Sequence, residues 1–290
     1  MSAKIYAKPS PVAVAKRQWP DTEITKSPIW NAVDLRDGNQ ALPDPMTPAQ
    51  KREYFKLLCD IGFKEIEVGF PAASHDDFQF CRDLIEQNLI PADVTISVLT
   101  QARPHLIEKT MEALKDVKQA IVHFYIATSE LHHRFVFGLE ADQLIQTAEA
   151  ATQQIREAVD AMPKSRVRLE FSPEEFTDTD MQLAVNICEK VVDTWKPADD
   201  ERVVLNLPAT VERRMPNEYA DMIEAFKSSL KEPEKCCISV HVHNDMGMGV
   251  ASTMQGLMAG ADRVEGTLFG NGERTGNVDL VTLGLNMFTQ

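Results

Sequence analysis

Two histidines, His241 and His243, stand two residues apart at the end of a segment with β-branched residues at 238, 240 and 242. Side chains two apart on a strand project from the same face, so both imidazoles can reach one point. The Asn-Asp-x-Gly sequence that follows, residues 244–247, is typical of a turn. Two imidazoles at a strand end can bind a metal ion, although two half-buried strand histidines are an equally simple interpretation.

Two further polar segments also follow predicted strands. They are Asp34-Leu-Arg-Asp-Gly38, which offers the Asp37 carboxylate, and Gly270-Asn-Gly-Glu-Arg-Thr-Gly276, which offers the Asn271 amide. If these segments meet the histidines, the donors occupy one side of a divalent cation and leave other positions open for substrate. A structural polar cluster is the alternative. Zinc, manganese and magnesium all suit such mixed nitrogen and oxygen ligands.

The elements that must position these residues alternate between strand-like and helix-like patterns. The predicted strands are residues 31–35, 65–68, 94–99, 119–126, 166–171, 202–206, 237–242 and 263–267, eight in all. Predicted helices include 48–61, with Thr47 as N-cap and Gly62 as terminator, 139–162, 218–230, 249–260 and 278–288. Eight strands, each followed by a helix, predict an α/β fold, a TIM (β/α)8 barrel. An open doubly wound sheet is the alternative, but no glycine-rich dinucleotide fingerprint follows the first strand.

The predicted domain organisation is simple. Residues 1–27 are interrupted by prolines and unpatterned, which indicates an extended N-terminal arm, and residues 28–290 form one barrel domain. No apolar run approaches the roughly 20 residues of a membrane span, and no secretory signal is evident. Asp21, Glu23 and the scarcity of Arg and Ser argue against a transit peptide.

Composition restricts the class of partner. The 290 residues carry a formal net charge of −14 and are 43% hydrophobic. An acidic chain of this kind argues against nucleic acid or an anionic membrane as the main partner. The five cysteines show no CxxC spacing, which favours reduced thiols and a cytoplasmic protein.

In such a barrel, functional groups lie at the carboxyl ends of the strands, and closure places the last strand beside the first and the seventh. Asp37, His241, His243 and Asn271 are therefore expected to converge on one sector of the rim.

Other polar residues are predicted at the same rim. Arg36 could stabilise a developing alkoxide or hold a carboxylate, or form an internal ion pair. Gln40 could contact substrate or order its loop, and His123 could contact substrate or be a core histidine. Glu174 could be an acid or base, or a solvated loop residue, and Thr210 could cap a helix or bind a carboxylate.

Several motifs together carry a family resemblance. Residues 34–40 (Asp-Leu-Arg-Asp-Gly-Asn-Gln), His241-Val-His243 and residues 269–277 (Phe-Gly-Asn-Gly-Glu-Arg-Thr-Gly-Asn) resemble the signature of the DRE-TIM metallolyase superfamily. Residues 206–212 (Asn-Leu-Pro-Ala-Thr-Val-Glu) and 170–174 (Glu-Phe-Ser-Pro-Glu) narrow the resemblance to the α-isopropylmalate synthase family, in the branch with a long N-terminal arm. The resemblance runs from about residue 3 to the end of the sequence.

That resemblance implies an acyltransferase of leucine biosynthesis. The reaction is a Claisen-type condensation of acetyl-CoA with 2-oxoisovalerate, followed by thioester hydrolysis, which gives 2-isopropylmalate and CoA. One divalent metal ion is implied at Asp37, His241, His243 and Asn271. The implied substrate contacts are Arg36, Gln40, His123, Ser172 and Thr210. The implied catalytic residues are Arg36, Glu174 and His123.

Family members of this kind continue past the barrel into linker subdomains and a leucine-sensing domain, and form homodimers. The linker of the partner subunit supplies a His and a Tyr that assist proton transfer. The present sequence ends at Gln290, so we expect the catalytic barrel only, an excised domain rather than a natural short form, with impaired activity. The alternatives are another member of the superfamily (homocitrate synthase, citramalate synthase or a lyase running the reverse cleavage) and a catalytically silent barrel that binds metal and oxoacid.

Overall fold

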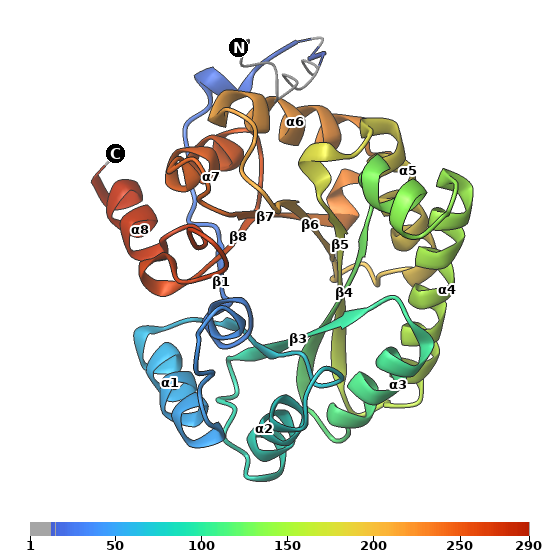
Figure 1. Ribbon diagram of the computed structural model, residues 1–290, viewed down its shortest axis with the longest axis vertical. Helices are drawn as coiled ribbons and strands as arrows, with labels where there is room; N and C mark the ends of the chain where they lie inside the picture. The colour runs from blue at the N-terminus through green and yellow to red at the C-terminus, as the bar shows by residue number, and fades with distance from the viewer. Residues whose placement is uncertain (1–12, 15, 290) are drawn as a thin grey trace.

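Eight parallel strands form a closed barrel inside a ring of helices (Figure 1). The computed structural model describes residues 13–14 and 16–289. The strands are β1 (Ile29–Ala32), β2 (Glu65–Gly69), β3 (Thr95–Gln101), β4 (Gln119–Ala127), β5 (Arg166–Glu174), β6 (Val203–Ala209), β7 (Cys236–Val242) and β8 (Arg263–Gly266). The helices are α1 (Pro48–Ile61), α2 (His75–Glu86), α3 (Pro104–Ala113), α4 (Ala141–Asp160), α5 (Met181–Trp195), α6 (Pro216–Ser229), α7 (Gly249–Met258) and α8 (Leu280–Thr289). The predicted TIM barrel is confirmed, and the open doubly wound sheet is wrong.

The strands are buried on both faces, as expected for parallel strands covered by helices. Every residue of β6 and of β7 is buried. Helices supply the outer layer through apolar residues at steps of three and four, as in α5, where Ala184, Ile187 and Val191 are buried. Closure is made by β1 and β8, which pair from Ile29↔Arg263 to Ala32↔Gly266. The apolar core therefore lies between the sheet and the helices, and buried polar side chains occupy the interior of the barrel.

Local sequence signals explain the helix boundaries. Thr47 caps α1, because its side chain accepts from the Gln50 amide and forms a capping box with Gln50. Gly62 ends α1 with φ 113°, which favours glycine. The predicted long helix 139–162 is α4, which runs from Ala141 to Asp160, so only its ends differ from the prediction.

The first strand differs from the prediction. A strand was expected at 31–35, but β1 ends at Ala32 and residues Asp34–Gly38 form a π-helical turn, η2. The cause is the Val33 carbonyl, which accepts hydrogen bonds from the amides of Arg36, Asp37 and Gly38 at 3.2, 2.8 and 3.2 Å. π-helical turns are rare and frequently lie at functional sites. This one carries two predicted site residues, Arg36 and Asp37.

The described part of the N-terminal arm is anchored to the barrel. Residues 1–12 and 15 of the predicted arm lie outside the described residues. Trp19–Asp21 form a short 3-10 turn, and the buried Trp19 donates from Nε1 to Asp221 Oδ1 of α6 at 2.8 Å. The amides of Gln18 and Trp19 both donate to Glu224 Oε1 at 2.9 Å, so this turn is fixed on α6.

All five cysteines are free thiols, as predicted. Cys59 lies in α1 and Cys188 in α5, in agreement with the helical pattern around each. Among the described residues, no helix has the length and apolar character needed to cross a membrane.

Asp34 joins three parts of the barrel at its closure. Its Oδ1 accepts from Tyr54 Oη of α1 and from the Leu268 amide beyond β8, both at 2.9 Å. Burial raises the pKa of this carboxyl to about 6, against the lowering effect of the Tyr54 and Leu268 hydrogen bonds. Its Oδ2 is buried without a hydrogen-bond partner among the described residues, so no donor stabilises a negative charge on that oxygen.

We predict that Asp34→Asn flattens the pH dependence of stability. A carboxyl whose folded pKa lies above its unfolded pKa contributes stability that is complete below the unfolded pKa and lost as the pH rises through about 6. The loss from about pH 4 to above pH 7 is at most about 3 kcal/mol for a shift of about two units. Asn keeps an acceptor for Tyr54 and Leu268 without the charge.

Urea unfolding at pH 5 and pH 7.5 measures this effect. As the pH rises from 5 to 7.5, the free energy of unfolding of the variant should increase relative to that of the parent protein. Equal pH dependence in the two proteins would show that Asp34 is ionised throughout this range.

Candidate metal centre at the barrel mouth

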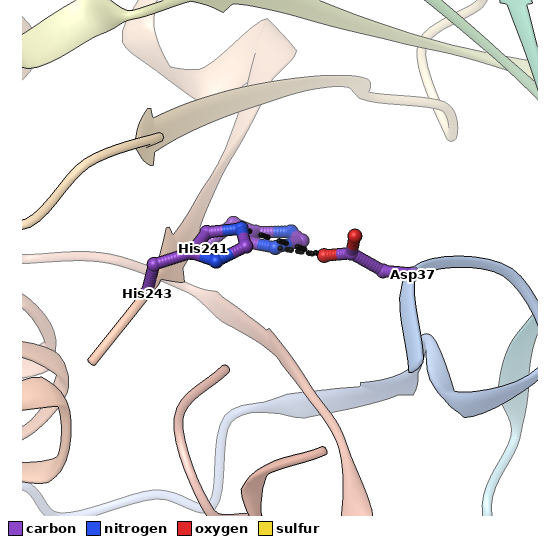
Figure 2. Close-up of side chains that lie close together, drawn as sticks. All are labelled: Asp37, His241 and His243. Carbon is purple, nitrogen blue, oxygen red and sulfur yellow. Dashed lines mark hydrogen bonds and ion pairs between the residues drawn. The ribbon is translucent and has the colours of Figure 1, made fainter. Parts of the chain in front are cut away.

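Three predicted ligands meet at the carboxyl ends of β1 and β7. Asp37 projects from η2 toward the two imidazoles of His241 and His243, which lie side by side (Figure 2). Their ligand atoms all lie within 4.8 Å of one another. Asp37 Oδ2 is 3.0 Å from His241 Nε2 and 3.5 Å from His243 Nε2, and all three residues are buried. The two-residue spacing on β7 therefore directs both rings to one carboxylate.

The charges of the cluster suit a cation. Burial alone would raise the pKa of Asp37, but the Arg36 guanidinium and hydrogen bonds from both histidines hold it well below its usual range. Burial lowers the pKa of His241, but Asp37 and Glu265 outweigh burial and raise it to about 9. His243 Nδ1 is buried without a hydrogen-bond partner among the described residues. An anionic carboxylate, an imidazolium whose proton a cation would displace, and an unused ring nitrogen together fit a divalent ion.

The fourth predicted ligand must be corrected. Asn271 is exposed, and its backbone carbonyl accepts from Thr267 Oγ1 at 2.6 Å and from Asn277 Nδ2 at 3.0 Å. The buried Asn277 reaches the cluster instead, with Oδ1 2.8 Å from His241 Nε2. The cause is an isolated antiparallel bridge between His243 and Asn277, which draws residue 277 back over the end of β7.

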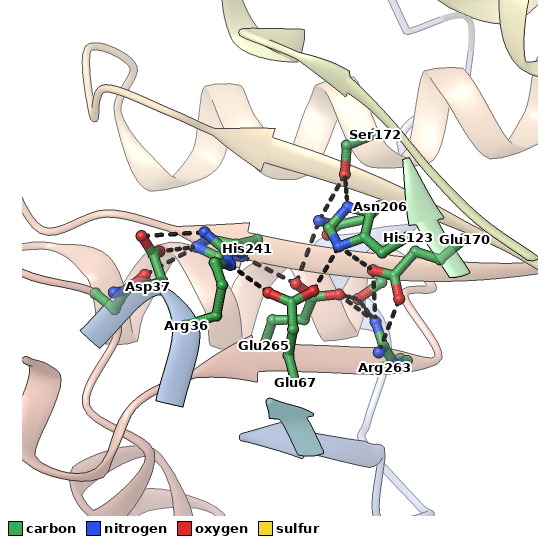
Figure 3. Close-up of polar contacts among 12 residues, drawn as sticks. Arg36, Asp37, Glu67, His123, Glu170, Ser172, Asn206, His241, Arg263 and Glu265 are labelled. Atoms are coloured by element: carbon green, nitrogen blue, oxygen red, sulfur yellow. Dashed lines mark hydrogen bonds and ion pairs between the residues drawn. The ribbon is translucent and has the colours of Figure 1, made fainter. Parts of the chain in front are cut away.

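A buried carboxylate holds His241 from behind. Glu265 Oε2 lies 3.0 Å from His241 Nδ1, an arrangement that fixes the ring and leaves Nε2 for a metal. Glu265 is part of a charged cluster inside the barrel, in which Arg263 donates to Glu170 and Glu265 (Figure 3). Arg263 also donates to Glu65. Burial and the neighbouring Glu265 charge raise the pKa of Glu170 well above its usual range, and Arg263 opposes this shift.

Arg36 and His123 share a second buried carboxylate, Glu67. Arg36 Nε donates to Glu67 Oε1, and Arg36 Nη1 lies 3.2 Å from Asp37 Oδ1. His123 Nδ1 lies 2.7 Å from Glu67 Oε2, and its Nε2 lies 2.7 Å from Ser172 Oγ (Figure 3). The ion pair expected as an alternative for Arg36 is therefore present, and His123 is a fully hydrogen-bonded buried residue that also faces the mouth.

These groups surround a cavity of about 160 Å³. Its polar lining comprises Arg36, Asp37, Gln40, His123, Tyr125, Ser172, Glu174, Asn206, Thr210, His241, His243 and Glu273. Its apolar lining comprises Phe70, Leu99 and Pro208. All predicted site residues except Asn271 therefore lie on one cavity.

Glu174 and Thr210 occupy the ends of neighbouring strands on this cavity. Burial and the adjacent Glu175 raise the pKa of Glu174, which is half-buried. Thr210 Oγ1 accepts from the Glu175 amide at 2.9 Å. Gln40 is exposed, and its Nε2 donates to Asp37 Oδ1 at 2.8 Å, so it supports the carboxylate as well as facing the cavity.

Sequence reasoning missed four residues: Glu67, Asn206, Glu265 and Asn277. Glu67 and Glu265 lie inside short buried strands. A glutamate is almost never fully buried unless it has a charged or polar partner. That pattern is a signal for a buried charged network. Asn277 gave a weaker signal, because Asn271 belongs to the same motif and lies nearer the strand.

The two asparagines offer a direct test of the ligand set. We predict that Asn277→Ala weakens binding of a divalent cation by about 10-fold or more, the lower end of the loss for residues that support a metal site. Asn271→Ala is the matched control and should leave affinity unchanged, because its side chain is exposed. Competition against a chromogenic chelator, with Mn²⁺ and Zn²⁺ in turn, measures both. A larger loss for Asn271→Ala would restore the original prediction.

Known proteins resemble this chain at two levels. Among solved structures, hydroxymethylglutaryl-CoA lyase from Pseudomonas aeruginosa aligns with TM-score 0.68 and 20% identity, over 91% of this chain and 86% of that one. The lyase from Brucella melitensis aligns with TM-score 0.68 and 18% identity, over 91% of each chain. At these identities the likeness concerns the fold.

Sequence relatives are much closer. The 2-isopropylmalate synthase of Rhodospirillum rubrum is 54% identical over 289 residues, 99% of this chain and 52% of the relative. The mitochondrial 2-isopropylmalate synthase 2 of Saccharomyces cerevisiae is 53% identical over 284 residues, 97% of this chain and 47% of the relative. The chain thus spans about half the length of these relatives. The resemblance drawn from the motifs is confirmed, and since the HMGL-like family model matches residues 27–290, the chain belongs to the HMGL-like family.

Proposed function

We propose that residues 28–290 form the catalytic barrel of a 2-isopropylmalate synthase, with residues 1–27 as an N-terminal arm. The reaction is the condensation of acetyl-CoA with 2-oxoisovalerate. One observation carries this proposal: the donor cluster Asp37–His241–His243 opens on the cavity that Arg36 and Thr210 also line. Relatives that match nearly all of this chain bear the synthase name, which supports the same substrates.

The residues that would hold a divalent cation are Asp37, His241, His243 and Asn277. Their donor atoms are a carboxylate oxygen, two imidazole nitrogens and an amide oxygen, a mixture that suits zinc, manganese or magnesium. When bound there, the ion supplies Lewis-acid polarisation of a ketone.

The chain's own residues would bind and orient the oxoacid. The guanidinium of Arg36 faces the cavity beside Asp37 and can stabilise negative charge that develops on the ketone oxygen. The Thr210 hydroxyl oxygen is occupied by the Glu175 amide, so its hydrogen is free to donate to the oxoacid carboxylate. Phe70, Leu99 and Pro208 offer an apolar wall for the branched side chain.

Glu174 is the group best suited to take a proton from the acetyl methyl group. Its raised pKa brings the carboxylate nearer to neutral pH, where a general base works most efficiently. The methyl carbon then forms the new bond to the ketone carbon, and the ketone oxygen, now an alkoxide, takes up a proton. Hydrolysis of the thioester by water releases the CoA thiol. His123 is fixed between Glu67 and Ser172 and would help to orient the substrate on this side of the cavity.

We predict that Arg36→Lys lowers the turnover number by about 100-fold, a typical cost for losing a donor to a developing oxyanion. Lysine keeps the charge but lacks the planar guanidinium. It therefore cannot donate to Glu67 and to the substrate at the same time in the geometry of arginine. CoA release, followed with a thiol-reactive dye, measures turnover, and metal content should stay the same. An unchanged turnover number would place Arg36 among the structural ion pairs.

A panel of 2-oxoacids tests the substrate. Among the residues that line the cavity, Arg36 is the only Arg or Lys, and the wall is apolar, so a second carboxylate has no cation to meet. We predict that the metal-loaded chain binds 2-oxoisovalerate more tightly than 2-oxoglutarate or pyruvate in calorimetric titration. Preference for 2-oxoglutarate would indicate a homocitrate synthase, and preference for pyruvate a citramalate synthase. Binding without CoA release when acetyl-CoA is added would indicate a barrel that is catalytically silent by itself.

A further inference from the structure

Two non-glycine residues in the left-handed region contact the same threonine. Glu175 has φ 61° and Arg274 has φ 57°, conformations that carry a steric cost for a residue with a Cβ atom. The Glu175 amide donates to Thr210 Oγ1 at 2.9 Å, and Arg274 Nη2 donates to the Thr210 carbonyl at 2.6 Å. Thr210 is therefore held at both its side chain and its backbone, from the loops after β5 and β8.

Asp245 completes the arrangement from the loop after β7. Arg274 Nε donates to Asp245 Oδ1 at 2.7 Å, and the Glu212 amide donates to Asp245 Oδ2 at 2.9 Å. Arg274 therefore reaches the loop of Thr210 twice, once directly and once through Asp245. The Asn244 amide also donates to the Gly276 carbonyl at 3.0 Å, which joins the loop after β7 to the segment of Arg274.

The same segments carry the candidate metal ligands. Asp245 lies two residues after His243, and Arg274 lies three residues before Asn277. A rigid connection between these loops sets the spacing between the Thr210 hydroxyl and the cation site. A 2-oxoacid that is held at both places needs that spacing to be constant, because groups that are not held in the productive geometry bind a ligand less well.

We propose that Arg274 is a positioning residue, which fixes the Thr210 hydroxyl at a set distance from the metal ligands so that it can donate to an anionic oxygen of the substrate. The role of that hydroxyl rests on the proposed function, whereas the rigidity of the connection does not. Strained backbone at both Glu175 and Arg274 agrees with a role beyond stability, since such strain persists where the surroundings and function maintain it.

Amide exchange tests the connection without any ligand. Arg274→Lys keeps the charge but loses the planar fork that joins Asp245 to the Thr210 carbonyl. The expected result is that the Glu175 amide, which bonds to Thr210 Oγ1, exchanges about fivefold faster or more, the equivalent of one hydrogen bond. Arg52→Lys is a matched control, because the Arg52–Asp83 pair has the same 2.7 Å separation and 37%/15% exposure, against 37%/16% for Arg274–Asp245. Unchanged exchange in Arg274→Lys would overturn the proposal.

A double-mutant cycle tests the consequence for binding. In the metal-loaded chain, Arg274→Lys and Thr210→Val should each lower the affinity for 2-oxoisovalerate by about five- to tenfold. The double variant should bind within about twofold of Thr210→Val alone, because Arg274 acts through Thr210. Thr210→Ser should restore binding, and metal affinity should stay constant throughout.

Multiplying effects in the double variant would show that Arg274 acts elsewhere and would overturn the proposal. If Thr210→Val leaves oxoacid affinity unchanged, the ligand role of the hydroxyl is wrong, and this inference falls with it. Failure of the unmodified chain to bind the oxoacid would overturn the substrate role and the proposed function together. In that case the exchange of the Glu175 amide still decides whether Arg274 fixes the loop.

Discussion

The guanidinium of Arg263 is the buried charge on which the barrel mouth depends. It is completely buried and donates to Glu65, and also to Glu170 and Glu265, as Figure 3 shows for these last two. Carboxylates removed from water cost several kcal/mol each unless a partner compensates, and Arg263 is a cation that all three of these side chains contact. Because Glu265 in turn holds Nδ1 of His241, charge balance inside the barrel sets the orientation of a ring at its mouth.

The barrel mouth holds two carboxyl groups, Asp37 and Glu174, whose surroundings carry different charges. Asp37 is kept anionic by Arg36 and the histidines, while Glu174 is pushed toward protonation by burial and by Glu175. Two carboxylates on one cavity thus have their pKa values shifted in opposite directions, a difference that suits a candidate ligand on one side and a candidate acid or base on the other. The difference arises from the cation beside one and the anion beside the other.

Short-range rules explain what the sequence could predict. The barrel follows from alternating strand and helix patterns, and the His241–His243 pair follows from the two-residue period of a strand. Asp37 was found through its place after the first strand, although that strand ends earlier and gives way to a π-helical turn. Asn277 was not found, because its choice over Asn271 depends on a bridge to His243 that no local pattern specifies. Glu67 and Glu265 needed the register of neighbouring strands, which links residues far apart in the chain.

Barrel closure also has a consequence for synthesis of the protein. The first candidate ligand is residue 37 and the last is residue 277, and they meet only when β8 pairs with β1. A nascent chain on the ribosome holds Asp37 long before the histidines and Asn277 exist. It cannot assemble this donor set until nearly all of the barrel has emerged. If these four residues hold a cation, they can do so only late in synthesis, once nearly the whole barrel is available.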